Sequence, residues 1–394
     1  MQLYIIKHKM RKMKDLNVIF ITLDGLRQDR LNLMPNLSSI SEKGLFFSNM
    51  ISVSPYTFTS IPSIFCGIYP SLNGIDSYYS MFRFKKNKCK TLSQYFKDAG
   101  YYTFADVLND CILPNIGFDE MKLHTMEDDL IVLHKKILSG IPKNKKFFLY
   151  LHYTTIHDEY IKLAKKYNDF DENYFNSYEE NKKFYDSCVK QTDKYVKEIV
   201  DYIKELGLFE NTFIVFHSDH GTSNGEKAGE KLYGCFTYDY SLKVFSTFLI
   251  PGQEGKKINF QCRTIDIMPT ILDIMEINPD ERFEKLQGKS LLSFVRGEEN
   301  EDRIVFVETG GLGGPWPSPR KHNVFCVRYK NKKLIYNATP KTFEFYDLEK
   351  DSEENFNLIE TNNASLVEII QEYKKILFEK IKENKINLSE NEKI

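Results

Sequence analysis

The stretch that decides the fold runs from Asn17 to Gly25 and reads Asn-Val-Ile-Phe-Ile-Thr-Leu-Asp-Gly. Its apolar, largely β-branched residues predict a short strand that is buried on both faces, as in a parallel sheet. The apolar run stops just before Asp24, so the strand would carry a carboxylate at its carboxyl end. Because sites in parallel sheets form at such ends, we expect Asp24 to be a site residue.

Two further apolar runs follow the same pattern. Residues 146–153 (KFFLYLHY) include His152 near their end and lead to His157, and residues 212–217 (TFIVFH) lead to Asp219 and His220. Helical patterns lie between these runs, at residues 35–43, 91–99, 177–206 and 265–275. Strands that alternate with helices predict an α/β fold, a doubly wound and mostly parallel sheet with helices on both faces.

The pattern changes after about residue 300. Short alternating runs at residues 304–308, 324–329 and 333–336 precede an amphipathic helix near residues 366–381. We expect an N-terminal extension (1–15), a catalytic α/β domain (16–300) and a small C-terminal antiparallel α+β subdomain (301–394) packed on it. The Tyr- and charge-rich segment 158–180 is either an insertion over the site or a surface loop that leads into a helix.

The composition restricts the class of protein. The chain has 394 residues, of which 42% are hydrophobic and 28% are charged, and its formal net charge is -1. This balance is typical of a soluble globular protein and gives no basic surface for nucleic acid. The seven cysteines form no CxxC pair, and no apolar run is long enough for a signal peptide core or a membrane span. We therefore expect reduced thiols, no membrane span and a cytoplasmic location, with the oligomeric state left open.

A cluster of hydroxyls precedes a short predicted helix that ends at Gly67. Thr57, Thr59 and Ser60 lie near the start of this helix, where free N–H groups attract anions such as phosphate. A threonine hydroxyl needs a base or a metal ion to act as a nucleophile near neutral pH. The alternative interpretation is that these hydroxyls only cap the helix.

The order of several motifs resembles the sulfatase and type I phosphodiesterase families of the alkaline phosphatase superfamily. The resemblance spans roughly residues 16–360 and implies the fold of that superfamily. Its motifs are Thr22-Leu-Asp-Gly-Leu-Arg-Gln-Asp29, Pro35-Asn-Leu37 with Glu42-Lys-Gly44, Gly67-Ile-Tyr-Pro70, Ser218-Asp-His-Gly221, Tyr238 to Val244, Thr264 to Asp273, Leu286 to Leu292 and Glu344 to Leu358.

The resemblance also implies roles for particular residues. Thr57 lies ten positions before Gly67, where the sulfatases have their nucleophile, and Asp24, Asp219 and His220 fall on metal-ligand positions. Together with the Thr57 oxygen they would bind one divalent ion, Zn, Mn, Mg or Ca. The imidazole ligand favours Zn or Mn. A second metal is not expected, because the sequence shows no further Asp/His/His set.

The chain departs from true sulfatases at the nucleophile. Those enzymes mature a cysteine or serine to formylglycine and have Pro and Arg two and four positions later, whereas this chain has Thr57, Thr59 and Ile61. A threonine is not the usual precursor of formylglycine, and the missing Arg removes a cation beside the ester. The departure therefore favours a metal-bound alkoxide that acts on phosphate esters.

Further residues are predicted to contact the substrate. His157 resembles the sulfatase histidine that touches the ester oxygens, which implies substrate contact or protonation of the leaving group, and the backbone N–H of Phe58 would bind a non-bridging oxygen. His152 is either a site residue or a buried histidine. Arg27 is expected to form a structural salt bridge.

Three cations are weaker candidates for substrate binding. Lys231 lies where the related families often place a substrate-binding Lys or His, and Lys227 is its rival. Arg320 follows the only tryptophan, Trp316, in a Gly- and Pro-rich loop. This loop would hold a sugar ring or an anionic group, or it is only a connection.

We therefore expect a metal-dependent hydrolase or transferase of phosphate or sulfate esters with Thr57 as its nucleophile. The substrate would be a small-molecule or glycan ester, such as a phosphoester of a sugar, lipid or glycan precursor. One alternative is a sulfatase that works without formylglycine. The other is a non-catalytic binding protein that keeps the sulfatase fold.

Overall fold

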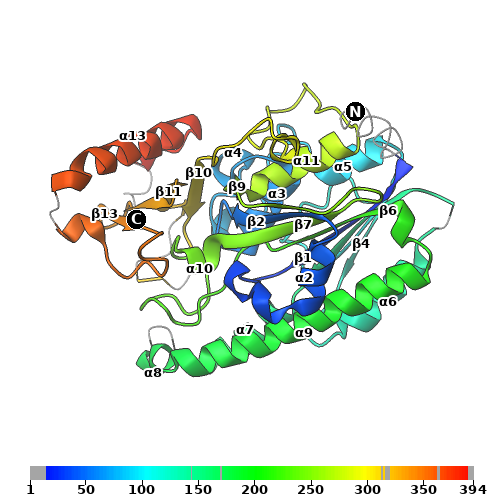
Figure 1. The fold of residues 1–394 in the computed structure, drawn as a ribbon, viewed down its shortest axis with the longest axis horizontal. Coiled ribbons are helices and arrows are strands. Elements are labelled where there is room, and N and C mark those ends of the chain that lie inside the picture. Colours follow the sequence, from blue (N-terminus) through cyan, green and yellow to red (C-terminus); the bar gives the residue numbers. More distant parts are fainter. Residues whose placement is uncertain are drawn as a thin grey trace.

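The computed structural model describes residues 15–142, 144–168, 171–311, 314–315, 320–361 and 364–388. The predicted N-terminal extension lies outside these residues, except for Asp15. A sheet of nine strands forms the centre, in the order β4-β3-β5-β1-β6-β7-β2-β8, with β9 paired to β2 (Figure 1). The strands are β1 (Asn17–Leu23), β2 (Leu45–Ile51), β3 (Tyr102–Val107), β4 (Glu120–Leu123), β5 (Phe147–Tyr153), β6 (Thr212–His217), β7 (Lys243–Leu249), β8 (Lys256–Ile258) and β9 (Cys262–Arg263).

The centre of this sheet is parallel. β1 lies between β5 and β6 and runs parallel to both, whereas β7 runs antiparallel to its neighbours β6 and β2. All seven residues of β1 are buried, because helices cover both faces of the sheet and leave no face for polar side chains. The predicted strands at 17–22, 146–153 and 212–217 are thus confirmed within one residue at each end.

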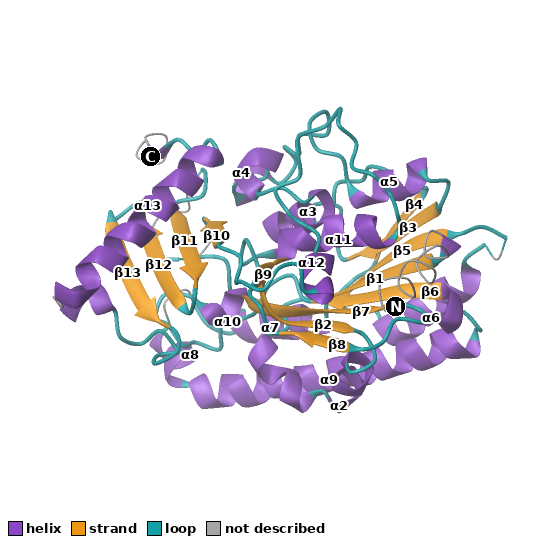
Figure 2. Cartoon of the chain, turned by 45° about the horizontal axis from the view of Figure 1, so that its top comes forward, coloured by secondary structure: helices purple, strands orange, loops and turns teal. Residues whose placement is uncertain are grey.

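Helices cover both faces of the sheet. Figure 2 shows α3, α5 and α11 on one side and α2 and α9 on the other. Each layer has its own apolar cluster against the sheet. The helices are α2 (Pro35–Ser41), α3 (Thr57–Cys66), α4 (Pro70–Asn73), α5 (Leu92–Asp98), α6 (Leu130–Gly140), α7 (Thr155–Ala164), α8 (Glu172–Asn176), α9 (Tyr178–Glu205), α10 (Asp239–Leu242), α11 (Ile267–Ile274), α12 (Leu292–Arg296) and α13 (Val367–Glu383).

A separate antiparallel sheet follows the main one. Its order is β10-β11-β12-β13, formed by β10 (Val305–Thr309), β11 (Val324–Tyr329), β12 (Lys332–Asn337) and β13 (Thr342–Asp347). The helix α13 packs on it through Tyr373, Leu377 and Ile381. The predicted fold class is confirmed, and β13 is a strand that the sequence pattern missed. The division near residue 300 stays a proposal about domains.

The segment 158–180 forms the helices α7 and α8 and the start of α9. Tyr160 and Tyr174 anchor it in the protein, since both rings are buried. It is thus a packed part of the fold, and α7 carries His157 in its first turn. None of the described helices combines the length and apolarity that crossing a bilayer requires.

A buried ion cluster joins the two sheets. Lys333 on β12 is fully buried, and its ammonium lies 2.6 Å from Asp239 Oδ1 and 2.7 Å from Glu354 Oε1. Asp239 begins α10, which leads directly into β7 of the main sheet. Arg328 also contacts Asp239, at 3.2 Å. This cluster therefore fixes the small sheet against the strand that borders β6.

We expect Lys333→Met to lower the free energy of unfolding by about 3–5 kcal/mol, because removing one partner leaves buried carboxylates without their cation. Lys332→Met is the matched control, since the neighbouring Lys332 forms a partly exposed pair with Asp347, and we expect it to cost less than about 1 kcal/mol. Urea denaturation of both variants measures the difference. Equal losses would show that the cluster does not join the sheets energetically.

Candidate functional site

Asp24 and Asp219 lie just beyond the carboxyl ends of the adjacent strands β1 and β6. Thr22 and His217 are paired in the register of these parallel strands, so each aspartate follows its paired residue by two positions. The N–H of Gly25 donates to Asp219 Oδ1 at 3.3 Å. The predicted meeting of the two carboxylates at one sheet edge is therefore confirmed.

Thr57 is the first residue of α3. The preceding residue, Tyr56, is extended (φ -153°), and the helix ends at Gly67, whose φ of 66° is left-handed. Glycine adopts this conformation without strain, which explains the sharp end of the helix. The Thr57 side chain is buried and faces Asp24 and His220 rather than capping the helix.

Two serines fix the position of Asp219 relative to α3. Ser60 Oγ and Ser52 Oγ both donate to the Asp219 backbone carbonyl, at 2.8 and 2.5 Å. Ser60 lies one turn after Thr57 on the helix, and Ser52 directly follows β2. Because these buried bonds join the helix to the turn after β6, they hold Thr57 and Asp219 at a constant separation.

Four side chains converge in a geometry that suits a metal ion. Thr57 Oγ1 lies 3.3 Å from Asp24 Oδ2 and 3.0 Å from His220 Nε2. His220 Nε2 lies 3.7 Å from Asp24 Oδ1 and 3.5 Å from Asp219 Oδ2. Ligands about 2.0–2.1 Å from a tetrahedral ion are about 3.3 Å apart. The donor set of two carboxylates, one imidazole and one hydroxyl therefore fits one divalent ion.

The negative charges of these two buried carboxylates would also be stabilised by a cation. Asp24 Oδ1 and Asp219 Oδ2 are buried with no hydrogen-bond partner among the described residues. Burial and the charge of Asp24 raise the pKa of Asp219. Burial opposes ionisation of Asp24 as well, but the charge of His157 and the hydrogen bond with His152 hold the pKa of Asp24 well below its usual range. A bound cation would relieve the repulsion between the pair.

The backbone sets the orientation of the His220 ring. His220 Nδ1 lies 2.7 Å from the Gly221 carbonyl, so Nδ1 carries the proton and Nε2 presents its lone pair to the site. Metal-ligating histidines are commonly fixed in this way. His152, whose role the sequence left open, lies behind the site with Nε2 at 2.9 Å from Asp24 Oδ2. It supports the carboxylate and does not line the pocket.

His157 approaches the same site from the first turn of α7. Its Nδ1 lies 3.0 Å from Asp158 Oδ1, and its ring lines a small pocket together with Asp24 and Thr57. Burial alone would lower the pKa of His157, but the negative charges of Asp24, Asp158 and Asp219 raise it. The ring is therefore biased toward its cationic form, which can donate a proton.

Aromatic and apolar side chains form the rest of the pocket wall. Phe58 stands edge-on to Tyr78 at 5.6 Å, and the Tyr233 ring lies 4.4 Å from that of His220. The pocket is completed by Leu108, Asn109 and Ile112. The backbone N–H of Phe58 belongs to the first turn of α3, which has no helical carbonyl to accept it. Sequence reasoning missed Tyr78 and Tyr233, because no pattern along the chain connects them to the nucleophile.

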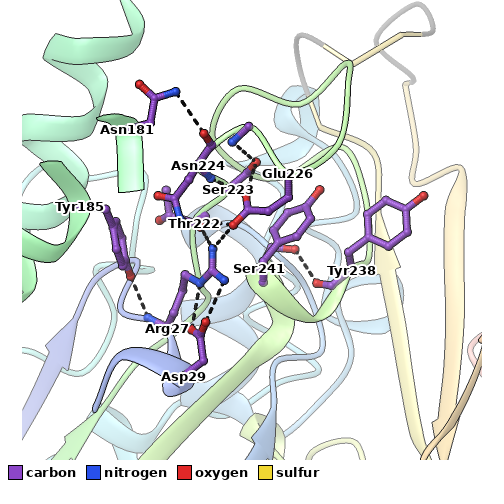
Figure 3. A network of polar contacts seen from close by, with 12 residues as sticks. Arg27, Asp29, Asn181, Tyr185, Thr222, Ser223, Asn224, Glu226, Tyr238 and Ser241 are labelled. Atoms are coloured by element: carbon purple, nitrogen blue, oxygen red, sulfur yellow. Dashed lines mark hydrogen bonds and ion pairs between the residues drawn. The ribbon is translucent and has the colours of Figure 1, made fainter. Parts of the chain in front are cut away.

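Arg27 fixes the loop that follows His220, as Figure 3 shows. Its guanidinium forms two 2.9 Å hydrogen bonds with Asp29, donates to the Thr222 carbonyl at 3.2 Å and pairs with Glu226. Glu226 in turn accepts a hydrogen bond from Ser223 Oγ at 3.1 Å. Burial opposes the charge on Arg27, but Glu226 and Asp29 raise its pKa well above the usual value. The expected structural role of Arg27 is confirmed.

The three candidate cations lie away from the pocket. Lys231 Nζ donates to the carbonyl oxygens of Tyr167 and Ala164, at 3.1 and 3.5 Å. Lys227 donates to Asn355 Oδ1 at 3.0 Å. Arg320 is exposed, and Trp316 lies outside the described residues. The structure therefore does not bring Lys231, Lys227 or Arg320 together with Thr57.

The position that holds Arg in true sulfatases is occupied by Ile61. Its side chain is fully buried in the apolar cluster between α3 and the sheet. An arginine could not replace it there without a buried counter-charge. The packing of α3 therefore accounts for the apolar residue at the position where sulfatases have Arg.

Comparison with known proteins agrees with this geometry. The Sulfatase family model matches residues 16–277, and the model of the C-terminal part of N-sulphoglucosamine sulphohydrolase matches residues 232–383. An arylsulfatase of Clostridium perfringens is 28% identical over 184 residues, which cover 44% of this chain and 34% of that protein. An ulvan-active sulfatase of Formosa agariphila is 29% identical over 161 residues, 39% of this chain and 30% of that protein. The chain thus matches about a third of the length of these relatives.

Solved structures share the whole fold. A 2-O glycosaminoglycan sulfatase superposes with a TM-score of 0.76 at 19% identity, over 94% of this chain and 93% of that chain. The phosphonate monoester hydrolase of Agrobacterium radiobacter superposes with a TM-score of 0.73 at 16% identity, over 94% of this chain and 96% of that chain. These likenesses show that the chain shares the fold of these proteins. The chain belongs to the sulfatase family of the alkaline phosphatase superfamily.

Proposed function

We propose that the protein cleaves or transfers a phosphate ester with Thr57 as its nucleophile. The observation that carries this proposal is the position of Thr57 Oγ1, which lies 3.0 Å from His220 Nε2 and 3.3 Å from Asp24 Oδ2 at the start of α3. Threonine and the apolar Ile61 argue against the formylglycine chemistry of true sulfatases. The substrate would be a small-molecule or glycan ester.

Asp24, Asp219, His220 and Thr57 would hold one divalent ion, with Zn or Mn favoured by the imidazole ligand. Such an ion would lower the pKa of the Thr57 hydroxyl and neutralise charge on the ester oxygens. The two partnerless oxygens of Asp24 and Asp219 support this assignment.

The chain's own residues supply the remaining steps. Thr57 Oγ1 passes its proton to Asp24 Oδ2, which lies 3.3 Å away, and forms a bond to phosphorus in line with the leaving group, while the bond from phosphorus to the ester oxygen breaks. His157 donates a proton to the departing oxygen, and the Phe58 N–H stabilises a non-bridging oxygen. Water or an acceptor alcohol then attacks the phosphorus and gives its proton to the now neutral His157. The bond from phosphorus to Thr57 Oγ1 breaks, and the proton held by Asp24 returns to Thr57, which restores the free hydroxyl.

Sulfate esters are the second candidate substrate class. It is favoured by the sulfatase relatives and by a structural neighbour solved with its substrate D-glucosamine-2-N,6-O-disulfate. A chain of this kind would have to hydrolyse sulfate esters without formylglycine. Parallel assays on p-nitrophenyl phosphate, bis-p-nitrophenyl phosphate and p-nitrophenyl sulfate distinguish the two classes.

We also propose a cytoplasmic location. No disulfide joins the seven cysteines, all of which lie in the described part of the chain, and this fits a compartment where thiols are kept reduced.

We expect Thr57→Ala to lower kcat on p-nitrophenyl phosphate by about 10³-fold or more, because it removes the nucleophile. Thr57→Ser keeps a hydroxyl and should retain most of the activity. Thr59→Ala is the matched control, since Thr59 lies on the same helix but bonds to Ser54. Intact-mass analysis should find a phosphoryl adduct on the wild type that is absent from Thr57→Ala. A Thr57→Ala enzyme with full activity would exclude the proposal, and inactive wild type without an adduct would favour a binding protein.

We expect one divalent ion per chain in the purified protein, and a chelator should remove it together with the activity. His220→Ala should bind far less of the ion, because it removes a direct ligand. His217→Gln is the control: His217 is buried three residues earlier and bonds to Thr22, so this variant should keep the ion. Elemental analysis measures the content. Unchanged metal in His220→Ala would contradict the assigned ligand set.

A further inference from the structure

A second buried polar cluster lies beside the site and takes no part in the steps above. Asp106 on β3 contacts two histidines through one oxygen, Oδ2: His124 Nδ1 at 2.7 Å and His134 Nε2 at 3.1 Å. His134 lies on α6, and its Nδ1 is 2.6 Å from the hydroxyl of Tyr195 on α9. All four side chains are buried.

This cluster is connected to His157 by hydrogen bonds. His124 Nε2 lies 3.3 Å from Thr154 Oγ1, at the start of α7. Thr154 Oγ1 donates to Asp158 Oδ2 at 2.6 Å, and the other oxygen of Asp158 lies 3.0 Å from His157 Nδ1. A continuous buried chain therefore runs from Tyr195 on α9 to the ring that lines the pocket.

The number of available protons fixes which group donates and which accepts in each of these hydrogen bonds. The Thr154 hydroxyl has one proton, which it donates to Asp158, so its oxygen can only accept from His124. His124 then donates from both ring nitrogens, from Nε2 to Thr154 and from Nδ1 to the carboxylate of Asp106. At the other end, Asp158 accepts from Thr154 at one oxygen and from His157 Nδ1–H at the other.

We propose that Asp106, His124 and Thr154 are positioning residues that orient Asp158 and thereby keep a proton on His157 Nδ1. The ring then presents its Nε2 edge to the leaving group. This inference rests on the proposed function in one respect, the contact of His157 with the substrate. Besides Asp158, the charged groups that act on His157 are Asp24 after β1 and Asp219 after β6, and the Tyr233 ring lies 6.2 Å away.

The free-energy cost of burying these side chains favours a specific role for the hydrogen-bonded path. Burying polar side chains costs free energy even when they are paired, and an apolar core of the same volume is often as stable. Here four elements, β3, α6, α7 and α9, and the loop after β4 each contribute a buried polar group to a single path that ends at the pocket. Such a network fixes side-chain orientation more strongly than isolated hydrogen bonds do.

A metal ion is the competing explanation for the Asp106 cluster. The three side chains could ligate an ion, and Asp106 Oδ1 is buried with no hydrogen-bond partner among the described residues. However, both imidazoles contact the same oxygen at hydrogen-bond distance, and 2.7 Å is shorter than the separation of about 3.3 Å expected between ligands of a tetrahedral ion. The geometry at Asp24, Asp219 and His220 differs from this, with separations of 3.5–3.7 Å from the imidazole to the two carboxylates.

The test uses the single acceptor oxygen of asparagine. In Asp158→Asn, the Thr154 hydroxyl attracts the amide oxygen, so the amide NH₂ faces His157 Nδ1 and removes its proton acceptor. We expect His157 Nδ1 to lose its proton, which ¹⁵N-histidine NMR of the full chain detects, with the His157→Gln spectrum for assignment. Turnover of phenyl phosphate should fall about 100-fold, because a poorer leaving group needs the acid. Turnover of p-nitrophenyl phosphate should fall less.

The double variant Asp158→Asn/Thr154→Val distinguishes an orienting role of Thr154 from a purely structural one. Without the Thr154 hydroxyl the amide oxygen is free to turn toward His157, so the Nδ1 proton should return and phenyl phosphate turnover should rise about tenfold above Asp158→Asn. Asp158→Asn/Thr192→Val is the matched control, since the buried Thr192 hydroxyl donates to the Cys188 carbonyl of its own helix and does not contact Asp158. It should show no recovery.

Three results would overturn the proposal: a retained Nδ1 proton in Asp158→Asn, no recovery in the double variant, or one metal ion fewer per chain in Asp106→Asn than in the wild type. The last result would assign the cluster to a metal. The NMR measurement does not depend on turnover, so it distinguishes failure of this inference from failure of the proposed nucleophile. Suppose that Thr57→Ala stays active, while the Nδ1 proton is lost in Asp158→Asn and returns in Asp158→Asn/Thr154→Val. In that case only the proposed function fails.

Discussion

Two buried carboxylates are forced together by the parallel pairing of β1 with β6. Asp24 and Asp219 cannot separate, because each follows a strand whose residues are buried on both faces. Their mutual repulsion must be offset by positive charge. The hydrogen bond from His152 to Asp24 and the charge of His157 offset part of it, and the arrangement of His220 and Thr57 around the carboxylates leaves room for a cation. The form of the site follows from this one constraint.

The rest of the fold keeps the neighbouring groups at fixed distances from this pair. The helix α3 is tied to Asp219 by Ser60, and the loop after β6 is tied to β1 by Arg27. The helix α7 brings His157 from the opposite layer of helices. Thr57 and His157 thus come from different faces of the sheet and meet at its edge, a position that neither layer could provide alone.

The family and the chemistry are separate conclusions. The sulfatase match establishes the family and the superposed structures establish the fold, and the same fold supports different reactions when the site changes. In this chain the change is local: threonine at position 57 and an apolar residue at position 61, which is packed into the core. The path of buried hydrogen bonds behind His157 is a further feature of this site. Its residues lie far from Thr57 in the sequence.

The sequence by itself determined three central strands, three of the four C-terminal antiparallel strands and the convergence of Asp24 with Asp219 and His220. These features depend on local apolar runs and on strand ends, which a single chain displays directly. The place of Thr57 beside them was implied by the resemblance to the sulfatases. Only the tertiary structure decided that Lys231 and Arg320 lie away from the pocket and that Tyr78 and Tyr233 form its wall. It also decided that His152 supports Asp24, and that Asp106, His124 and Thr154 lead to His157. Those contacts join residues tens to hundreds of positions apart, and their geometry depends on how loops and helices pack, for which the sequence carries no periodic signal.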